Sequence, residues 1–182
     1  MGTDKAFLEL QGHSLLSIAL EVAKSICDNV YIVGPKSKFA EFVEVVEDQY
    51  AGRGPLAGID AALQATATPL NLVLAVDLPF LTASFLTYLV EQSRLSKALV
   101  TVPQAGKGFQ PLCAVYHQGL RGAVRRALEQ GENKIDSLFS AVPVRVISEA
   151  ELQGRGFSAS LFDNLNTKRD LEGAQRRLAV NS

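Results

Sequence analysis

The spacing of apolar positions alternates between helical and strand periods along the chain. In SLLSIALEVAKSIC (14–27), apolar residues recur at helical spacing behind Ser14, a suitable N-cap, which predicts an amphipathic helix. The run NVYIVG (29–34) is short, rich in β-branched residues and closed by Gly34-Pro35, which predicts a strand. The same criteria predict strands over 43–48, 71–77, 98–103, 111–117 and 142–148, helices over 36–42, 55–67, 82–95, 121–130 and 136–140, a Thr167-capped helix closing the chain, and an irregular loop over 151–160.

The order of these segments predicts the fold class. Strands alternate with helices throughout, which favours βαβ units. The run NLVLAVD (71–77) is continuously apolar, as is typical of a strand buried on both faces of a parallel sheet. Residues 111–117 follow residues 98–103 across the turn QAGKGFQ, so we expect those two strands to pair antiparallel. We therefore predict one α/β domain over residues 1–182, with a three-layer, doubly wound, mostly parallel, Rossmann-like sheet and one antiparallel strand.

Composition narrows the class of protein. The 182 residues are 47% hydrophobic and 20% charged, as expected for a globular domain, and the net charge of −1 gives no sign of a nucleic-acid or membrane partner. The N-terminus has no apolar segment of a signal peptide, and the longest apolar runs are too short to span a membrane. Two cysteines outside any metal-ligand spacing suit a reducing compartment, so we expect a cytoplasmic protein.

Asp77 is the sharpest candidate for chemistry. In open α/β sheets, ligands bind beyond the carboxyl ends of the strands, and Asp77 directly follows the apolar run 71–76. A carboxylate at such a point needs a partner. Mg²⁺ is a suitable one, because it binds one or two carboxylates together with waters and substrate phosphates. The alternative is an ordinary turn or N-cap aspartate ahead of Pro79.

The loop GRGPLAG (52–58) is a candidate for anion or base binding. Its glycines allow close approach of a ligand to the backbone, and the loop runs into a helix N-terminus. Its central residues are Gly54, Pro55, Leu56 and Gly58. Glycine and proline before a helix are also ordinary helix-entry residues, so the motif alone is weak. Asp48, a few residues upstream, is either part of the same site or a solvated loop acid.

Four further polar residues are candidates for ligand binding, and most of them have an ordinary structural explanation as well. Lys5 could meet phosphates or lie on the surface as a solvated lysine. Asn164 and Asn166 are one residue apart on an extended segment, so their side chains point the same way; a capping turn with Thr167 is the alternative. Gln110 lies in the turn before the strand 111–117, at a strand end.

Taken in order, these segments resemble one family. GTDKAFLEL, VVEDQYAGRGPLAGIDAAL, LAVDLPFL, FQPLCAVY and NLNTKRDL are similar to motifs of the molybdenum cofactor guanylyltransferases, the molybdopterin-guanine dinucleotide biosynthesis protein A family. The resemblance covers nearly the whole chain, and the order and spacing of five motifs make it specific. It implies a nucleotidyltransferase fold and transfer of GMP from Mg-GTP to the terminal phosphate of molybdopterin, with release of pyrophosphate.

The resemblance also implies roles for individual residues. Lys5 matches the phosphate-binding lysine, and Asp77 matches the Mg²⁺ ligand. Asp48 and Gly54–Gly58 match guanine-side contacts, whereas Asn164 and Asn166, and less directly Gln110, match the pterin side. GTP and molybdopterin are the implied substrates, and proteins that insert or deliver the molybdenum cofactor are the implied partners. An anionic acceptor phosphate needs no strong general base, and the sequence offers no obvious histidine or cysteine for that role.

The sequence departs from the family's pattern in two places. The family begins with an apolar strand and a Gly-rich loop of the form LAGGxSxRMG, and Met1-Gly2 aligns with the end of that loop. Because that strand is central in the family's sheet, we expect an apolar seam and weak or no transferase activity from these 182 residues. Gly34-Pro35 stands where the family often carries a polar guanine-side residue.

Two other functions remain open from the sequence. One is a cytidylyltransferase or another nucleotidyltransferase of the same fold. The other is a non-catalytic module that binds molybdopterin or docks on a partner. Nucleotide competition separates the first from guanylyl transfer, and a transfer assay separates the second.

Overall fold

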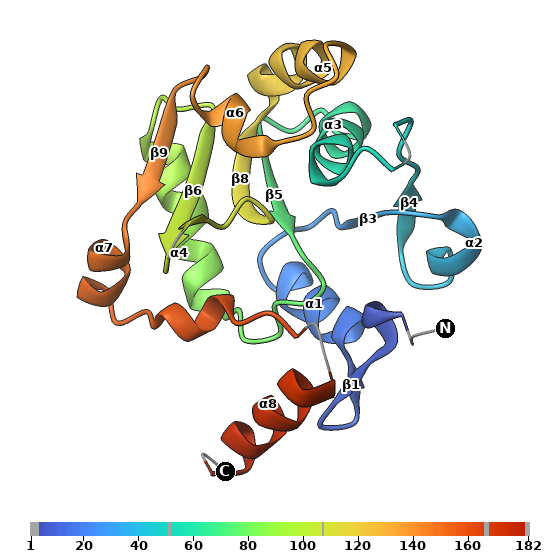
Figure 1. Ribbon diagram of the computed structural model, residues 1–182, viewed down its shortest axis with the longest axis vertical. Helices are drawn as coiled ribbons and strands as arrows, with labels where there is room; N and C mark the ends of the chain where they lie inside the picture. The colour runs from blue at the N-terminus through green and yellow to red at the C-terminus, as the bar shows by residue number, and fades with distance from the viewer. Residues whose placement is uncertain (1–3, 51, 107, 166–167, 181–182) are drawn as a thin grey trace.

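The computed structural model describes residues 4–50, 52–106, 108–165 and 168–180, and its largest element is a five-stranded sheet (Figure 1). The strands are β5 (Leu70–Leu74), β6 (Val100–Ala105), β7 (Gly108–Phe109), β8 (Cys113–His117) and β9 (Val144–Ile147). β8 lies between β5 and β6 and is antiparallel to both, whereas β9 is parallel to β6. The three strands β5, β6 and β9 therefore share one direction, which confirms the predicted mixed sheet and its antiparallel strand over 111–117.

Two smaller pairings lie outside this sheet. β3 (Tyr31–Val33) and β4 (Glu44–Val46) form a parallel pair with Ile32 opposite Val45. Both strands were predicted, but their separation from the main sheet was not. β1 (Glu9–Leu10) and β2 (His13–Ser14) form a hairpin that the sequence reading missed. Gln11 and Gly12 turn it with φ of 51° and 80°, the left-handed conformation that tight hairpin turns require.

Capping side chains start the helices α1 and α4. Ser14 Oγ accepts from the Ser17 amide at 3.1 Å to start α1 (Leu15–Lys24), and Thr82 Oγ1 accepts from the Phe85 amide at 3.3 Å to start α4 (Ala83–Leu95). Both caps were predicted; Thr167, the third, lies outside the described residues. The other helices are α2 (Lys36–Phe39), α3 (Pro55–Ala65), α5 (Arg121–Glu129), α6 (Ile135–Phe139), α7 (Glu149–Gly154) and α8 (Lys168–Val180), with short 3₁₀ turns η1 (Lys5–Phe7), η2 (Gln118–Leu120) and η3 (Ala159–Phe162).

Alternation along β8 divides the core into two layers. Ala114 and Tyr116 pack with α3, α5 and α6 on one face of the sheet. Cys113 and Val115 pack with α4, α7 and η3 on the other face, where Ile26 after α1 also contacts the cluster (Figure 1). Helices therefore cover both faces of the sheet, as a doubly wound arrangement requires.

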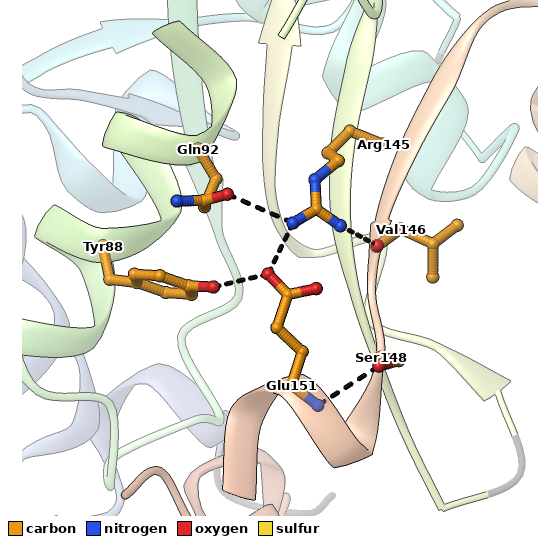
Figure 2. Close-up of polar contacts among 6 residues, drawn as sticks. All are labelled: Tyr88, Gln92, Arg145, Val146, Ser148 and Glu151. Atoms are coloured by element: carbon orange, nitrogen blue, oxygen red, sulfur yellow. Dashed lines mark hydrogen bonds and ion pairs between the residues drawn. The ribbon is translucent and has the colours of Figure 1, made fainter. Parts of the chain in front are cut away.

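The predicted irregular loop over residues 151–160 is wrong, because α7 and η3 occupy most of it. Ser148 Oγ caps α7 by accepting from the Glu151 amide. Figure 2 shows the Glu151 carboxylate accepting from Arg145 on β9 and from the Tyr88 hydroxyl on α4, while Arg145 also donates to Gln92. A serine followed by acidic residues is a helix-start signal that the glycines of this segment obscured.

Two expectations from composition can be compared with the described part of the chain. No helix there is both long and apolar enough to cross a membrane. Both cysteines are free thiols; Cys113 is buried and Cys27 is half-buried. Burial raises the pKa of the Cys113 thiol, which keeps it protonated and unreactive.

Candidate functional site

Asp77 and Lys5 meet where β5 leaves the sheet. Lys5 belongs to η1, which starts with the Asp4 carboxylate accepting from the Ala6 amide at 3.0 Å. The Lys5 ammonium lies 3.5 Å from Asp77 Oδ2. Asp77 keeps 18% of its side chain exposed and Lys5 keeps 47%, so both charges face solvent-accessible space. An ion pair between partly exposed groups contributes little to stability, so both charges can engage a ligand at little cost to the fold.

The segment before α8 is joined to the same turn. The Leu165 amide donates to the Asp77 carbonyl at 3.0 Å, and the Leu165 side chain is buried with Leu10 and Leu15. This places the exposed Asn164 beside the turn that carries Asp77. The structure therefore brings together Lys5, Asp77 and Asn164 from distant parts of the chain, whereas Asn166 lies outside the described residues.

The Asp48 loop and the start of α3 form the second part of the site. Asp48 Oδ1 accepts from the Tyr50 amide at 2.7 Å, so this acid orders its own loop. Gly54 adopts φ 72°, which favours glycine, and Pro55 begins α3 without any side-chain cap. Uncapped amides at a helix start can bind a ligand's anionic or polar groups. Leu56 is fully buried, backbone included, so it packs in the core and does not face a ligand in this structure.

Arg53 anchors this loop, and the sequence reading missed it. Its Nε donates to Asn133 Oδ1 at 2.6 Å, and its Nη2 donates to the Leu128 carbonyl at 3.0 Å. The guanidinium thus ties the loop before Gly54 to the C-terminal end of α5. The only sequence signal was an arginine between two glycines, which does not reveal a partner 80 positions away.

Gln110 lies in the turn that leads into β8. Its amide donates to the Pro103 carbonyl, and its carbonyl accepts from the Cys113 amide, both at 2.9 Å. Two residues on, the Leu112 carbonyl accepts from the Ala75 amide at 2.7 Å, at the end of β5. Gln110 therefore belongs to a turn beside the strand end that leads to Asp77, and its side chain is partly exposed.

The donor set at Asp77 suits a substrate-bound magnesium ion better than a resident metal. Within the described ranges, no group of three or more histidine, cysteine, aspartate or glutamate side chains could hold a metal ion. Mg²⁺ needs less, because it commonly binds through one or two carboxylates and completes its shell with waters and phosphates. A single, partly exposed carboxylate with an adjacent lysine fits that mode of binding.

The sequence and the fold are similar to those of known nucleotidyltransferases. The sequence model of the MobA-like NTP transferase domain matches residues 1–146. A probable molybdenum cofactor guanylyltransferase of Pelotomaculum thermopropionicum is 35% identical over 100% of this chain and 88% of its own length. A molybdenum cofactor guanylyltransferase of Desulfosudis oleivorans is 31% identical over 96% of this chain and 87% of its own. The crystal structure of molybdopterin-guanine dinucleotide biosynthesis protein A from Archaeoglobus fulgidus superposes with a TM-score of 0.85 at 26% identity, covering 98% of this chain and 92% of that one.

Proposed function

This chain belongs to the MobA-like NTP transferase family, and we propose that it transfers GMP from GTP to the terminal phosphate of molybdopterin and releases pyrophosphate. Relatives named molybdenum cofactor guanylyltransferases, which align over nearly the whole chain, support this pair of substrates. The observation in the molecule that carries the proposal is the 3.5 Å approach of Lys5 to Asp77 at the carboxyl end of β5. Ligands of open α/β sheets bind at such strand ends.

In the reaction, an oxygen of the acceptor phosphate attacks the α-phosphorus of GTP. The bond from that phosphorus to the bridging oxygen breaks, and its electron pair leaves with pyrophosphate. Asp77 would hold Mg²⁺, which would neutralise phosphate charge. Lys5 stabilises the negative charge that develops on the leaving group. The acceptor oxygen is already anionic, so the protein supplies position and charge rather than a base.

The guanine side is formed by the loop between β4 and α3. The backbone of the exposed Gly52 and Gly54 and the carboxylate of Asp48 offer donors and an acceptor for the edge of a base. Arg53 holds this loop against α5, so the loop is positioned before the nucleotide arrives. Preorganised donors of this kind bind without first being ordered by the ligand.

The pterin side is formed by Asn164 and Gln110, with Asn166 as a third candidate. Asn164 is assigned to the pterin side because it lies beside the Asp77 turn. Gln110 is assigned to it because it lies in the turn ahead of β8. Amide side chains offer both donors and acceptors, which suits a polar heterocycle. The product would pass in the cytoplasm to proteins that insert or deliver the molybdenum cofactor.

A transfer assay tests this function directly. We expect label from α-labelled GTP to appear on molybdopterin when protein is in excess and Mg²⁺ is present. In displacement of a fluorescent GTP analogue, we expect GTP to exceed CTP by at least about tenfold, or about 1.4 kcal/mol. Stronger displacement by CTP would overturn the guanine assignment. Tight molybdopterin binding without transfer would favour a non-catalytic module instead.

A further inference from the structure

The short turn that carries Lys5 is anchored to α2. Lys5 opens η1, and the Asp4 carboxylate directly ahead of it makes two contacts. Asp4 Oδ1 accepts from the Ala6 amide at 3.0 Å, and Asp4 Oδ2 accepts from the Lys38 ammonium on α2. Because both oxygens of one carboxylate are engaged, Asp4 joins the turn around Lys5 to a side chain 34 positions away.

The Lys38 ammonium also lies against two aromatic rings. It is 4.6 Å from the centroid of the Phe39 ring and 5.4 Å from that of the Phe7 ring, within the range of cation–π attraction. The two rings stack on each other with their centroids 6.1 Å apart. Phe7 belongs to η1 and Phe39 to α2, so the rings join the same two elements that Asp4 and Lys38 join.

Phe39 is fixed in turn by the end of β3. Its side chain is buried in a cluster with Ala6 and with Val45 of β4. A Cβ atom on Gly34 would lie 3.0 Å from the Phe39 ring, so a larger residue there would crowd the ring. This gives a packing reason for the glycine at a position where the family often carries a polar residue. α2 therefore rests on the β3–β4 pair, away from the five-stranded sheet (Figure 1).

Lys5 consequently connects the two sheets. Its turn is anchored through Asp4 to α2 and the β3–β4 pair, whereas its ammonium lies 3.5 Å from Asp77, beyond the end of β5 in the larger sheet. The Asp4 side chain is 49% exposed and that of Lys38 is 29% exposed. Ion pairs this exposed contribute little to stability, so substitutions of either residue should leave the fold intact.

We propose that Asp4 and Lys38 are positioning residues for Lys5 in GMP transfer, an inference that rests on the proposed function. Asp4 caps η1, and Lys38 holds the Asp4 carboxylate in the orientation that caps it. The Lys5 ammonium is thereby placed for the leaving pyrophosphate before GTP binds, and both residues act through Lys5 rather than on the nucleotide. Placement matters because a displacement of about 1 Å can cost about 10²-fold in rate.

Single-turnover transfer in two backgrounds tests this assignment. Asp4→Ala removes the cap and the ion pair, so it should slow transfer at least about tenfold in the parent chain, with a smaller change in GTP affinity. In the Lys5→Met chain there is no ammonium to place, so Asp4→Ala should slow transfer no further. Such non-additivity is expected of residues that act through one group. Thermal unfolding checks that each variant folds; if Asp4→Ala does not, Lys38→Met carries the same comparison.

Conservative variants separate the cap from the ion pair. Asp4→Asn keeps an acceptor for the Ala6 amide but loses the charge that pairs with Lys38, so its rate should lie between those of the parent and Asp4→Ala. Lys38→Met should slow transfer about as much as Asp4→Asn does. Lys38→Arg keeps the charge and its attraction to the rings, so it should restore most of the rate. Lys36→Met, at an exposed position of the same helix, is the matched control and should leave the rate unchanged.

Binding of inorganic pyrophosphate gives a readout that needs no acceptor. In calorimetry, Asp4→Ala and Lys5→Met should each weaken it at least about fivefold, and the double variant should bind no more weakly than Lys5→Met. Unchanged transfer or unchanged pyrophosphate affinity in folded Asp4→Ala would overturn this inference alone. Equal slowing by Asp4→Ala in both backgrounds would do the same. Full transfer by Lys5→Met would instead overturn the proposed role of Lys5, and this inference with it.

Discussion

The Lys5 ammonium lies 3.5 Å from Asp77 Oδ2, although the two residues are 72 positions apart. η1 presents the lysine and the end of β5 presents the carboxylate. Neither charge is buried deeply enough to need the other for stability, since the pair is partly exposed. Substitutions in this pair should therefore affect ligand binding more than folding, and the first two predictions concern it.

Asp77→Asn should remove metal-dependent GTP binding while leaving the fold intact. The turn is held by the Asp77 carbonyl, which accepts from Leu165 and is unchanged by the substitution. We expect the Mg²⁺-dependent part of GTP affinity to fall at least about tenfold in calorimetry. Glu91→Gln, at an exposed position of α4, is the matched charge control. Unchanged Mg-GTP affinity in Asp77→Asn would show that the metal role is wrong.

Lys5→Met should slow transfer more than it weakens GTP binding. If the ammonium acts on the leaving pyrophosphate, its removal should lower kcat by about 10²–10³, as for loss of one charge-stabilising donor. Single-turnover rates with protein in excess give this value. Lys5→Arg keeps the charge and should recover part of the rate. Equal losses in Lys5→Arg and Lys5→Met would indicate that the charge is not what matters.

Arg53→Ala should weaken GTP binding by loosening the loop before α3. The substitution removes two hydrogen bonds from a charged group, each of which contributes about 1.5–3 kcal/mol when well formed. We expect a higher Kd for GTP with unchanged affinity for the acceptor. Asn133→Ala removes one of these partners and should show a smaller effect. Arg126→Ala, at an exposed position of α5, should leave the Kd unchanged.

Asn164→Ala should weaken acceptor binding and leave GTP binding intact. Asn164 is exposed and lies beside the Asp77 turn, so its removal should not disturb the core. We expect a raised KM for molybdopterin with an unchanged GTP displacement curve. The same pattern is predicted for Asn166→Ala. Loss of GTP binding in either variant would put that residue on the nucleotide side of the site.

Because of the contacts of Glu151, the folded protein should lose stability when the pH becomes acidic. The hydrogen bond from Arg145 lowers the pKa of Glu151 below its ordinary value of 4.5, and the hydrogen bond from Tyr88 lowers it further, against the opposing effect of burial. A group whose pKa is lower in the folded state stabilises the fold above its unfolded pKa and loses that contribution as the pH falls through the folded pKa. Thermal unfolding measured from pH 6 down to pH 3 should therefore show a loss of Tm below about 4.5.

Glu151→Gln provides the matched test of that pH dependence. It keeps the shape of the side chain but cannot titrate, so the drop in Tm on acidification should become shallower. The variant should also be less stable than the parent at pH 6, because the charge-assisted bond to Arg145 is lost. Glu129→Gln, exposed at the end of α5, should retain the parent's acid profile. An identical acid profile in Glu151→Gln would contradict this origin of the effect.

Local patterns in the sequence predicted most elements of the fold, because they arise from interactions between near neighbours. Ser14 and Thr82 start helices through bonds to amides three residues away. The apolar run ahead of Asp77 identified the strand β5 and placed an acid beyond its end, but the expected burial on both faces is wrong, because four of the five residues of β5 are only half-buried. The same local reading missed α7, because the glycines of this segment obscured the helix start at Ser148. It also could not show the contacts of Glu151 with Arg145 and Tyr88, which form only in the folded protein. The single-domain assignment and the roles of the site residues stay predictions.

By itself, the sequence determined the alternation of strands and helices, the antiparallel direction of 111–117, and Asp77 as the leading candidate. Tertiary structure alone decided the rest. It brought Lys5 to Asp77, tied Arg53 to α5, and separated the β3–β4 pair from the larger sheet. The physical reason is range: periodicity and capping act within a few residues, whereas strand-edge pairing and the approach of distant charges depend on how the whole chain packs.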